Sequence, residues 1–393
     1  MGYDELTAKE ISYQINSGYW KVYNRCFFDK AECLRFASKI RNYQITYHFY
    51  DEVYNTIDWT KNPDQSLESM YRDRAHKIRE KYDYVALLFS GGCDSTNMLK
   101  SFIKNNIRID EIISFYPVEA SNKLLSNFNK DDKSACNLLF EYYEAVVPMF
   151  DYLKIHHPNI KLTVIDYTKK ALSFVETSTL NKLFVGGVTA HAHITGHYLA
   201  YESVSKHDNS CVVLGIDKPR ILYDKKDKKF KSYFFDFNTI HGHFPKDTFK
   251  QGIASTEYFY FDPEMPYIPV KQCHQILEEL INILSPNHRF HNQVLKDSGD
   301  KYIVDVHHDY IKQLLYPGWN TNIFQANKNF SYFFVEVNNW MLTSSLTDLK
   351  IKDFAISQGK ELSYGIDSRF IVYDDNKVPH KFIDMFTVKN SLH

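Results

Sequence analysis

The segment Tyr84–Lys100 constrains this chain most, because a glycine-containing turn joins an apolar run to a helical pattern there. The apolar or aromatic residues Tyr84–Phe89 predict a short buried strand. Ser90–Gly92 predicts a sharp turn, since glycine accepts backbone angles that other residues avoid. Residues 94–96 can cap a helix start, and apolar residues within 98–103 recur at helical spacing. A strand, a turn and a helix start in this order aim backbone N–H groups at an anion.

The order Ser-Gly-Gly-x-Asp-Ser at residues 90–95 resembles the signature of the PP-loop ATP pyrophosphatases, which include asparagine synthetases, NAD synthetases and tRNA-modifying enzymes. It is not a Walker loop, because the Gly-Lys-Ser/Thr ending is absent. The resemblance implies that the loop holds the β- and γ-phosphates of ATP while a substrate oxygen attacks the α-phosphate, so that AMP is transferred and pyrophosphate leaves. The nucleotide-binding residues that it implies are Ser90, Gly91, Gly92, Asp94 and Ser95. The alternative is a strand-to-helix turn without a ligand.

Three further segments predict strands that follow the first one: Glu111–Tyr116, Lys161–Asp166 and Ser210–Leu214. Helical patterns over 134–155 and 191–206 separate them. This alternation predicts parallel strands with right-handed crossovers in a doubly wound α/β layer. The superfamily resemblance implies the same class, the adenine nucleotide alpha hydrolase-like (HUP) fold. Ligands of such sheets bind at the carboxyl ends of the strands.

The ends of the first two strands flank the adenine in this superfamily. The resemblance therefore implies a nucleotide contact for backbone groups near Phe89 and Phe115. The alternative is that both aromatic side chains belong to the core.

A second candidate loop, Gly215–Arg220, follows the fourth predicted strand. Asparagine synthetases carry a Gly-x-x-Asp-Glu type segment near this point, whose acid helps to bind magnesium, but here Lys218 stands where an acid is expected. We expect Gly215 to contact the nucleotide, Asp217 and Asp94 to hold Mg²⁺, and Lys218 or Arg220 to neutralise the departing pyrophosphate. Asp94, Asp217 and Lys218 are thus the expected catalytic residues. The alternative is a polar turn after a strand.

Three histidines, His191, His193 and His197, precede the fourth strand. His193 and His197 are four residues apart and would share a helix face, a spacing that can ligate zinc. They lack the cysteine partners or intervening glutamate of known zinc motifs. Whether this cluster binds a metal or lines a pocket is left open.

The chain divides into an N-terminal α+β region (1–65), the PP-loop domain (66–245) and a mostly helical C-terminal cap or substrate region (246–393). Glutamine-dependent asparagine synthetases carry a cysteine directly after Met1, where this chain has Gly2 and Tyr3. We therefore expect no glutaminase, and nitrogen would come from ammonia, an amine substrate or a separate donor protein. The segments Asp262–Pro266 and Lys271–Gln272 resemble asparagine-synthetase-like proteins of tailed bacteriophages that also lack a glutaminase.

The composition limits the kinds of partner and cofactor that we expect this protein to bind. A formal net charge of -1 gives no electrostatic support for binding duplex nucleic acid or a membrane. None of the six cysteines forms a Cys-x-x-Cys pair, which argues against an iron–sulfur cluster. No signal peptide and no apolar run near 18 residues is visible. We expect a cytoplasmic protein, in the host cytoplasm if it is phage-encoded; the oligomeric state is left open.

These features predict an ATP-dependent ligase that adenylates a small molecule or a nucleotide, after which an amine or ammonia displaces AMP. ATP and Mg²⁺ are the expected cofactors. One alternative is a thiolase or transferase of the same superfamily that modifies a nucleobase or nucleic acid, which the absence of paired cysteines disfavours. Another is a nucleotide-binding module without catalysis.

Overall fold

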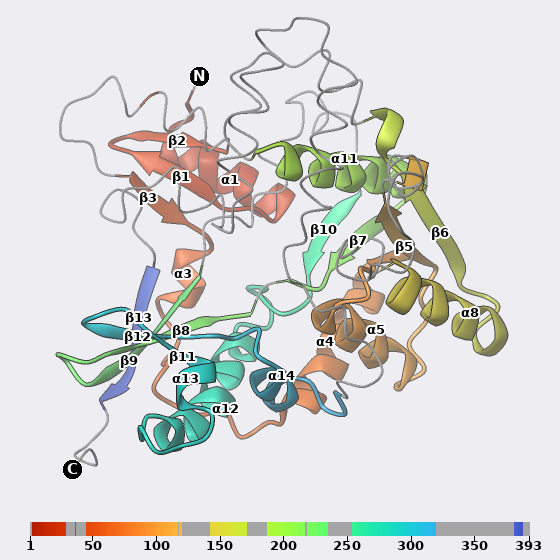
Figure 1. Ribbon diagram of the computed structural model, residues 1–393. Helices are drawn as coiled ribbons and strands as arrows, with labels where there is room; N and C mark the ends of the chain where they lie inside the picture. Colours follow the sequence, from red (N-terminus) through yellow and green to blue (C-terminus); the bar gives the residue numbers. More distant parts are fainter. Residues whose placement is uncertain are drawn as a thin grey trace, which may run out of the picture.

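The computed structural model describes residues 2–28, 36, 45–116, 118–119, 142–170, 187–216, 218–234, 254–319 and 381–387. Three sheets organise these residues: a small antiparallel sheet near the N-terminus, a five-stranded parallel sheet and a second five-stranded sheet that is antiparallel (Figure 1).

The N-terminal region combines helix α1 (Glu5–Ile15) with the antiparallel sheet β2-β1-β3, followed by the short helix α3 (Asp51–Tyr54). The strands are β1 (Tyr19–Val22), β2 (Arg25–Phe27) and β3 (Ile45–His48). Asp4 caps α1 by accepting a hydrogen bond from the Thr7 N–H at 3.0 Å. This matches the α+β character expected for the region.

The parallel sheet has the strand order β10-β7-β4-β5-β6. Its strands are β4 (Tyr84–Leu88), β5 (Glu111–Tyr116), β6 (Lys161–Asp166), β7 (Ser210–Leu214) and β10 (Ser255–Tyr258). Every neighbouring pair is parallel. The four strands expected from the sequence are confirmed, and the sheet takes its fifth strand, β10, from the C-terminal range 246–393.

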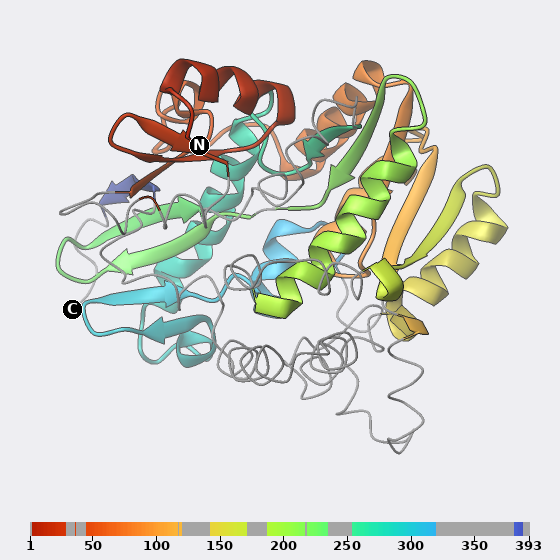
Figure 2. The ribbon, with the colours of Figure 1, turned by 90° about the horizontal axis from the view of Figure 1, so that it is seen from above.

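Helices cover both faces of this sheet, as Figures 1 and 2 show. Helices α5 (Cys93–Ile103) and α8 (Val147–His156) lie on one face, and α11 (Gly187–Val204) lies on the other. Helix α4 (Leu67–Lys81), capped by Ser66, packs beside α5. This architecture is compatible with a doubly wound α/β fold. The connections leave in opposite directions from β4, so the switch point lies between β4 and β7.

The second sheet has the order β11-β12-β8-β9-β13 and begins two residues after Lys218. Its strands are β8 (Arg220–Asp224), β9 (Lys229–Phe234), β11 (Leu295–Asp297), β12 (Lys301–Val304) and β13 (Lys381–Thr387). Helices α12 (Tyr267–Ile283), α13 (His291–Val294) and α14 (Asp309–Leu315) accompany it. The described part of 246–393 therefore mixes helices with strands, whereas we expected mostly helix.

A buried ion network ties α4 to the segment after β10. The fully buried Arg74 guanidinium lies 2.6 Å from the Glu257 carboxylate and 2.9 Å from that of Asp262. Burial raises the pKa of Asp262 to about 6, although Arg74 acts to lower it. Asn16, at the end of α1, donates a hydrogen bond to the Thr256 carbonyl at 3.0 Å. These contacts hold the helix that precedes β4 and link the N-terminal region to the edge of the parallel sheet.

Candidate functional site

The loop between β4 and α5 makes the sharp turn that the sequence predicted, but residues 94–96, expected to cap the helix, lie inside its first turns. Gly91 has a φ of +78°, in the left-handed region that glycine adopts readily. Gly92 is the N-cap of α5, with no side chain to hydrogen bond the first turn. The first N–H groups of an α-helix have no partner within the helix. The start of α5 therefore presents backbone donors and the positive end of a helix dipole at the carboxyl edge of β4.

Two serines brace this loop. The Ser90 and Ser95 hydroxyl oxygens lie 3.3 Å apart. The Ser95 hydroxyl donates to the Gly92 carbonyl at 3.1 Å, and the Gly92 N–H donates to the Ser90 hydroxyl oxygen at 3.3 Å. These contacts across six residues fix the curvature of the loop.

Gly215 brings the second loop against the first. It follows β7, the parallel neighbour of β4. A Cβ atom on Gly215 would lie 3.1 Å from the carbonyl carbon of Asp94 and from the backbone N and Cα of Ser95. A side chain would therefore press on the loop backbone, so the two strand ends approach this closely because residue 215 is glycine.

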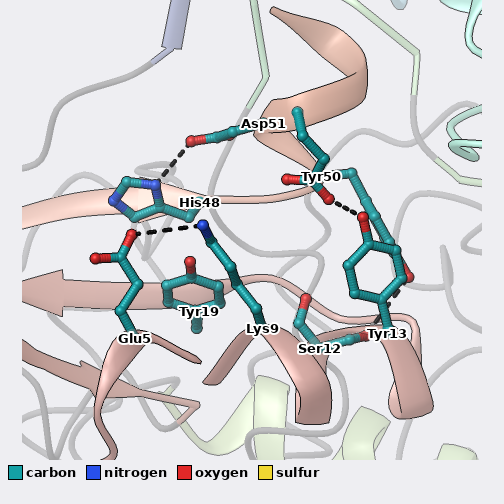
Figure 3. A pocket seen from close by; sticks show the side chains of 9 residues that line it. Glu5, Lys9, Ser12, Tyr13, Tyr19, His48, Tyr50 and Asp51 are labelled. Carbon is teal, nitrogen blue, oxygen red and sulfur yellow. Dashed lines mark hydrogen bonds and ion pairs between the residues drawn. The ribbon is translucent and has the colours of Figure 1, made fainter. Parts of the chain in front are cut away.

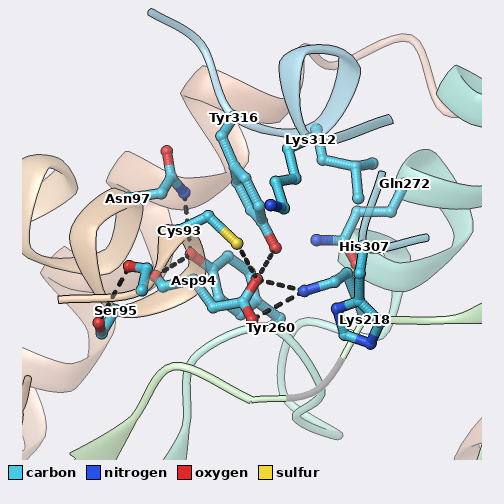
Figure 4. Close-up of polar contacts among 12 residues, drawn as sticks. Cys93, Asp94, Ser95, Asn97, Lys218, Tyr260, Gln272, His307, Lys312 and Tyr316 are labelled. Carbon is cyan, nitrogen blue, oxygen red and sulfur yellow. Dashed lines mark hydrogen bonds and ion pairs between the residues drawn. The ribbon is translucent and has the colours of Figure 1, made fainter. Parts of the chain in front are cut away.

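Asp94 and Lys218 form an ion pair at this junction, as Figure 4 shows. The Lys218 ammonium donates to the two carboxylate oxygens of Asp94 at 2.6 and 2.7 Å. Lys218 is 2% exposed, whereas the Asp94 side chain is 29% exposed. Because Lys218 is buried and bonded to Asp94, its ammonium group is held at one position beside the loop.

Two tyrosines from distant segments complete the surroundings of Asp94. The Tyr316 hydroxyl donates to the Asp94 carboxylate, and the Tyr260 hydroxyl donates to the Asp94 carbonyl at 2.7 Å. Asn97 donates to the Tyr260 oxygen at 3.0 Å. Burial acts to raise the pKa of Asp94, but the Lys218 ammonium and the Tyr316 hydroxyl outweigh it and lower the pKa to about 2. Asp94 is therefore a carboxylate at neutral pH.

Further basic side chains lie on the Lys218 side of the site. Figure 4 shows His307 beside Lys218, with Lys312 near Tyr316. An Arg220 guanidinium nitrogen lies 2.7 Å from the His307 Nε2 atom. The site thus pairs one carboxylate with several nitrogen groups that suit an anionic ligand.

The structure assigns the expected adenine neighbours mainly to the core. Phe89 is 2% exposed, and the Phe115 ring packs 4.7 Å from the His197 ring between centroids. The pairing of β5 with β4 extends only to Leu88↔Ile113, while β5 continues to Tyr116. The end of β5 therefore projects beyond β4, beside the loop.

Some expected residues have no described side chain. Asp217 lies outside the described residues, so its expected place in the Mg²⁺ site is untested. His191 and His193 belong to α11, but only its backbone is described there. His197 is buried. Among the side chains that are described, no three potential ligands come together as a metal site.

Tyr260, His307 and Tyr316 were not among the residues expected at the nucleotide site. The chain contains 29 tyrosines and 29 phenylalanines, so an aromatic residue carried no signal by its type alone. The proximity of a tyrosine to the loop was the missing information, and only the fold supplies it.

Neither a protein-family model nor a curated protein matches this chain. None of the described helices has both the length and the hydropathy needed to cross a bilayer.

Proposed function

We propose that this protein is an ATP-dependent, AMP-forming ligase of the PP-loop type, with the adenine nucleotide alpha hydrolase-like fold. The observation that carries the proposal is the junction of two loops at the switch point of a parallel sheet. There the glycine turn at 90–92 opens a helix, Gly215 packs against it, and Lys218 presents a buried ammonium. Ligands of doubly wound sheets bind at this position.

The roles of the residues follow from their chemistry. The loop from Ser90 to Ser95 binds the β- and γ-phosphates through backbone N–H groups. Lys218 exchanges part of its contact with Asp94 for the phosphates and offsets the charge of the departing pyrophosphate. Bound Mg²⁺ would supply further charge neutralisation, held by Asp94 and the phosphates. Asp94 stays ionised for this task because of its lowered pKa.

The protein's contribution to the reaction is positioning and electrostatics. A substrate oxygen attacks the α-phosphate, the bond to pyrophosphate breaks, and an amine or ammonia then displaces AMP from the adenylate. The projecting end of β5 near Phe115 supports an adenine position next to the loop. We propose a small molecule or a nucleotide as the acceptor. The nitrogen would come from ammonia, an amine or a separate donor protein.

The experiment is product analysis with α-labelled ATP, Mg²⁺ and a panel of amino acids, nucleotides and amines. We expect acceptor-dependent AMP and pyrophosphate, which disappear in Asp94→Asn. Asp227→Asn is the matched control, because Asp227 is exposed in the turn between β8 and β9. Release of ADP and phosphate would contradict attack at the α-phosphate. ATP binding without turnover would instead support a nucleotide-binding module.

The engagement of Asp94 by both Lys218 and Tyr316 favours that second candidate, because these contacts occupy the carboxylate expected to hold Mg²⁺. A third candidate, sulfur transfer, would need a reactive thiol. Among the described cysteines, Cys93 adjoins this site, with its sulfur 3.6 Å from the Asp94 carboxylate. The Cys93→Ser variant is expected to retain AMP formation. Loss of AMP formation in this variant would favour sulfur transfer.

A further inference from the structure

A cavity of about 210 Å³ lies in the N-terminal region, formed by residues of α1, β1, β3 and α3 (Figure 3). Its lining residues are Glu5, Lys9, Ser12, Tyr13, Tyr19, His48, Tyr50, Asp51 and Glu52. None of the loop residues 90–95 or 215–220 is among them. At ~30 Å³ per water molecule, the space equals about seven waters. This is room for a small organic ligand.

The base of the cavity is buried and aromatic, while its rim is charged. Tyr19 and Tyr50 are 4% and 6% exposed, respectively. The Tyr13 and Tyr50 rings meet edge to face, with centroids 4.9 Å apart. At the rim, the side chains of Glu5 and Lys9 are nearly half exposed. A ligand would enter past the charged groups and contact the faces and edges of the rings.

The charges of the lining favour a cation. Three carboxylates and one lysine are among the lining residues, but Asp51 is already bonded to His48 at 2.7 Å. Glu5 is already paired with Lys21. Glu52, by contrast, has the Tyr13 hydroxyl as its described partner, and no described basic group lies within ion-pair distance of it. The Tyr13 hydroxyl is neutral and does not offset the negative charge of the Glu52 carboxylate. Glu52 therefore still attracts a cation.

The Tyr19 hydroxyl is a polar group of the cavity that a ligand can contact. Figure 3 shows it pointing into the cavity, between the side chains of His48 and Lys9. Its ring stacks on that of His48, with centroids 5.3 Å apart. Tyr19 is 4% exposed as a residue, but its hydroxyl oxygen, for which the described part of the chain holds no hydrogen-bond partner, is accessible from the cavity and not enclosed. A ligand in the cavity can therefore reach this oxygen.

We propose that this cavity binds a small organic ammonium ion. The ammonium donates hydrogen bonds to the Glu52 carboxylate and to the Tyr19 oxygen, and the tyrosine rings contribute cation–π attraction. An organic cation fits better than a metal ion, because no three of the described side chains form a metal-ligand group. The inference does not rest on ATP binding at the loop.

The test uses the full chain without nucleotide, titrated calorimetrically with three compounds of similar size: n-hexylamine, n-hexanol and hexanoate. We expect binding of hexylamine and at least tenfold weaker binding of the other two. Glu52→Gln is expected to weaken hexylamine about tenfold, and Tyr19→Phe about threefold, through loss of one charged and one neutral hydrogen-bond partner. Glu10→Gln, an exposed change on α1 outside the cavity lining, is the control and is expected to have no effect.

Three outcomes would overturn the proposal. These are no heat of binding with hexylamine up to about 20 mM, well above a Kd of ~1 mM for weak binding, equal affinity for hexanoate, or unchanged hexylamine affinity in both pocket variants. Circular dichroism of each variant shows whether it is folded. If Glu52→Gln does not fold, Tyr19→Phe, which keeps the ring and its packing, decides the question.

Discussion

Replacing Lys218 by methionine is expected to destabilise the protein by about 2 to 4 kcal/mol at pH 7. Methionine fills much of the space of the lysine chain but leaves Asp94 without its ammonium partner. The magnitude follows from the pKa of Asp94, which falls from 3.8 to about 2 in the folded protein. At ~1.4 kcal/mol per pH unit, this difference corresponds to about 2 to 3 kcal/mol of net stabilisation of the ionised carboxylate.

The contribution of Asp94 to the free energy of unfolding depends on pH. The folded-state pKa of Asp94 is lowered, so its contribution to stability is present above the unfolded-state value of 3.8 and is lost as the pH falls toward 2. In Lys218→Met, burial becomes the main influence and raises the pKa of Asp94. The variant should therefore gain stability as the pH falls toward 4, and its difference from the wild type should shrink.

Urea denaturation of the wild type, Asp94→Asn, Lys218→Met and the double variant measures this pairing as a double-mutant cycle. We expect a coupling free energy of about 2 kcal/mol or more at pH 7. Lys226→Met, in the exposed turn after β8, is the control and should change the free energy of unfolding by less than about 0.5 kcal/mol. A coupling below about 0.5 kcal/mol, the limit of additivity, would refute the reasoning.

Three further changes test other parts of the structure. Gly215→Ala should lower AMP formation about tenfold or more, because the added Cβ would lie 3.1 Å from the loop backbone and would push the loop out of position. Unchanged activity would show that the close approach is not needed. Tyr316→Phe should raise the pKa of Asp94 and lower the free energy of urea unfolding by about 1 kcal/mol, because a hydrogen bond to the carboxylate is lost; equal stability would argue against that bond. In the wild type, Asp262 has a raised folded-state pKa, so its effect on stability becomes less favourable as the pH rises from about 4 to 6. Asp262→Asn should remove this trend in unfolding experiments across that range, and an unaltered slope would contradict it.

The sequence alone determined the local elements of the site. The apolar run Tyr84–Phe89 predicted β4, and shorter apolar segments that alternate with helical patterns predicted β5, β6 and β7. The pair Gly91 and Gly92 predicted the turn, because a left-handed backbone angle favours glycine. These signals lie within a few neighbouring residues, where sequence patterns are most informative.

Only the tertiary structure decided which distant residues meet at the loop. Lys218 and Asp94 are 124 positions apart, and Tyr316 and Asp94 are 222 apart. No periodicity links residues across such separations. Their contact depends on the strand order β10-β7-β4-β5-β6, which places β7 beside β4 and brings β10 in from the C-terminal range.

The cavity at Tyr19 is a further result of tertiary structure. Its residues come from a helix, two strands and a second helix, and none belongs to a motif that the sequence displayed. The sequence could specify each element by its own pattern of apolar and polar residues. Which polar side chains then face one another depends on how the elements pack, because packing buries surface from many parts of the chain at once.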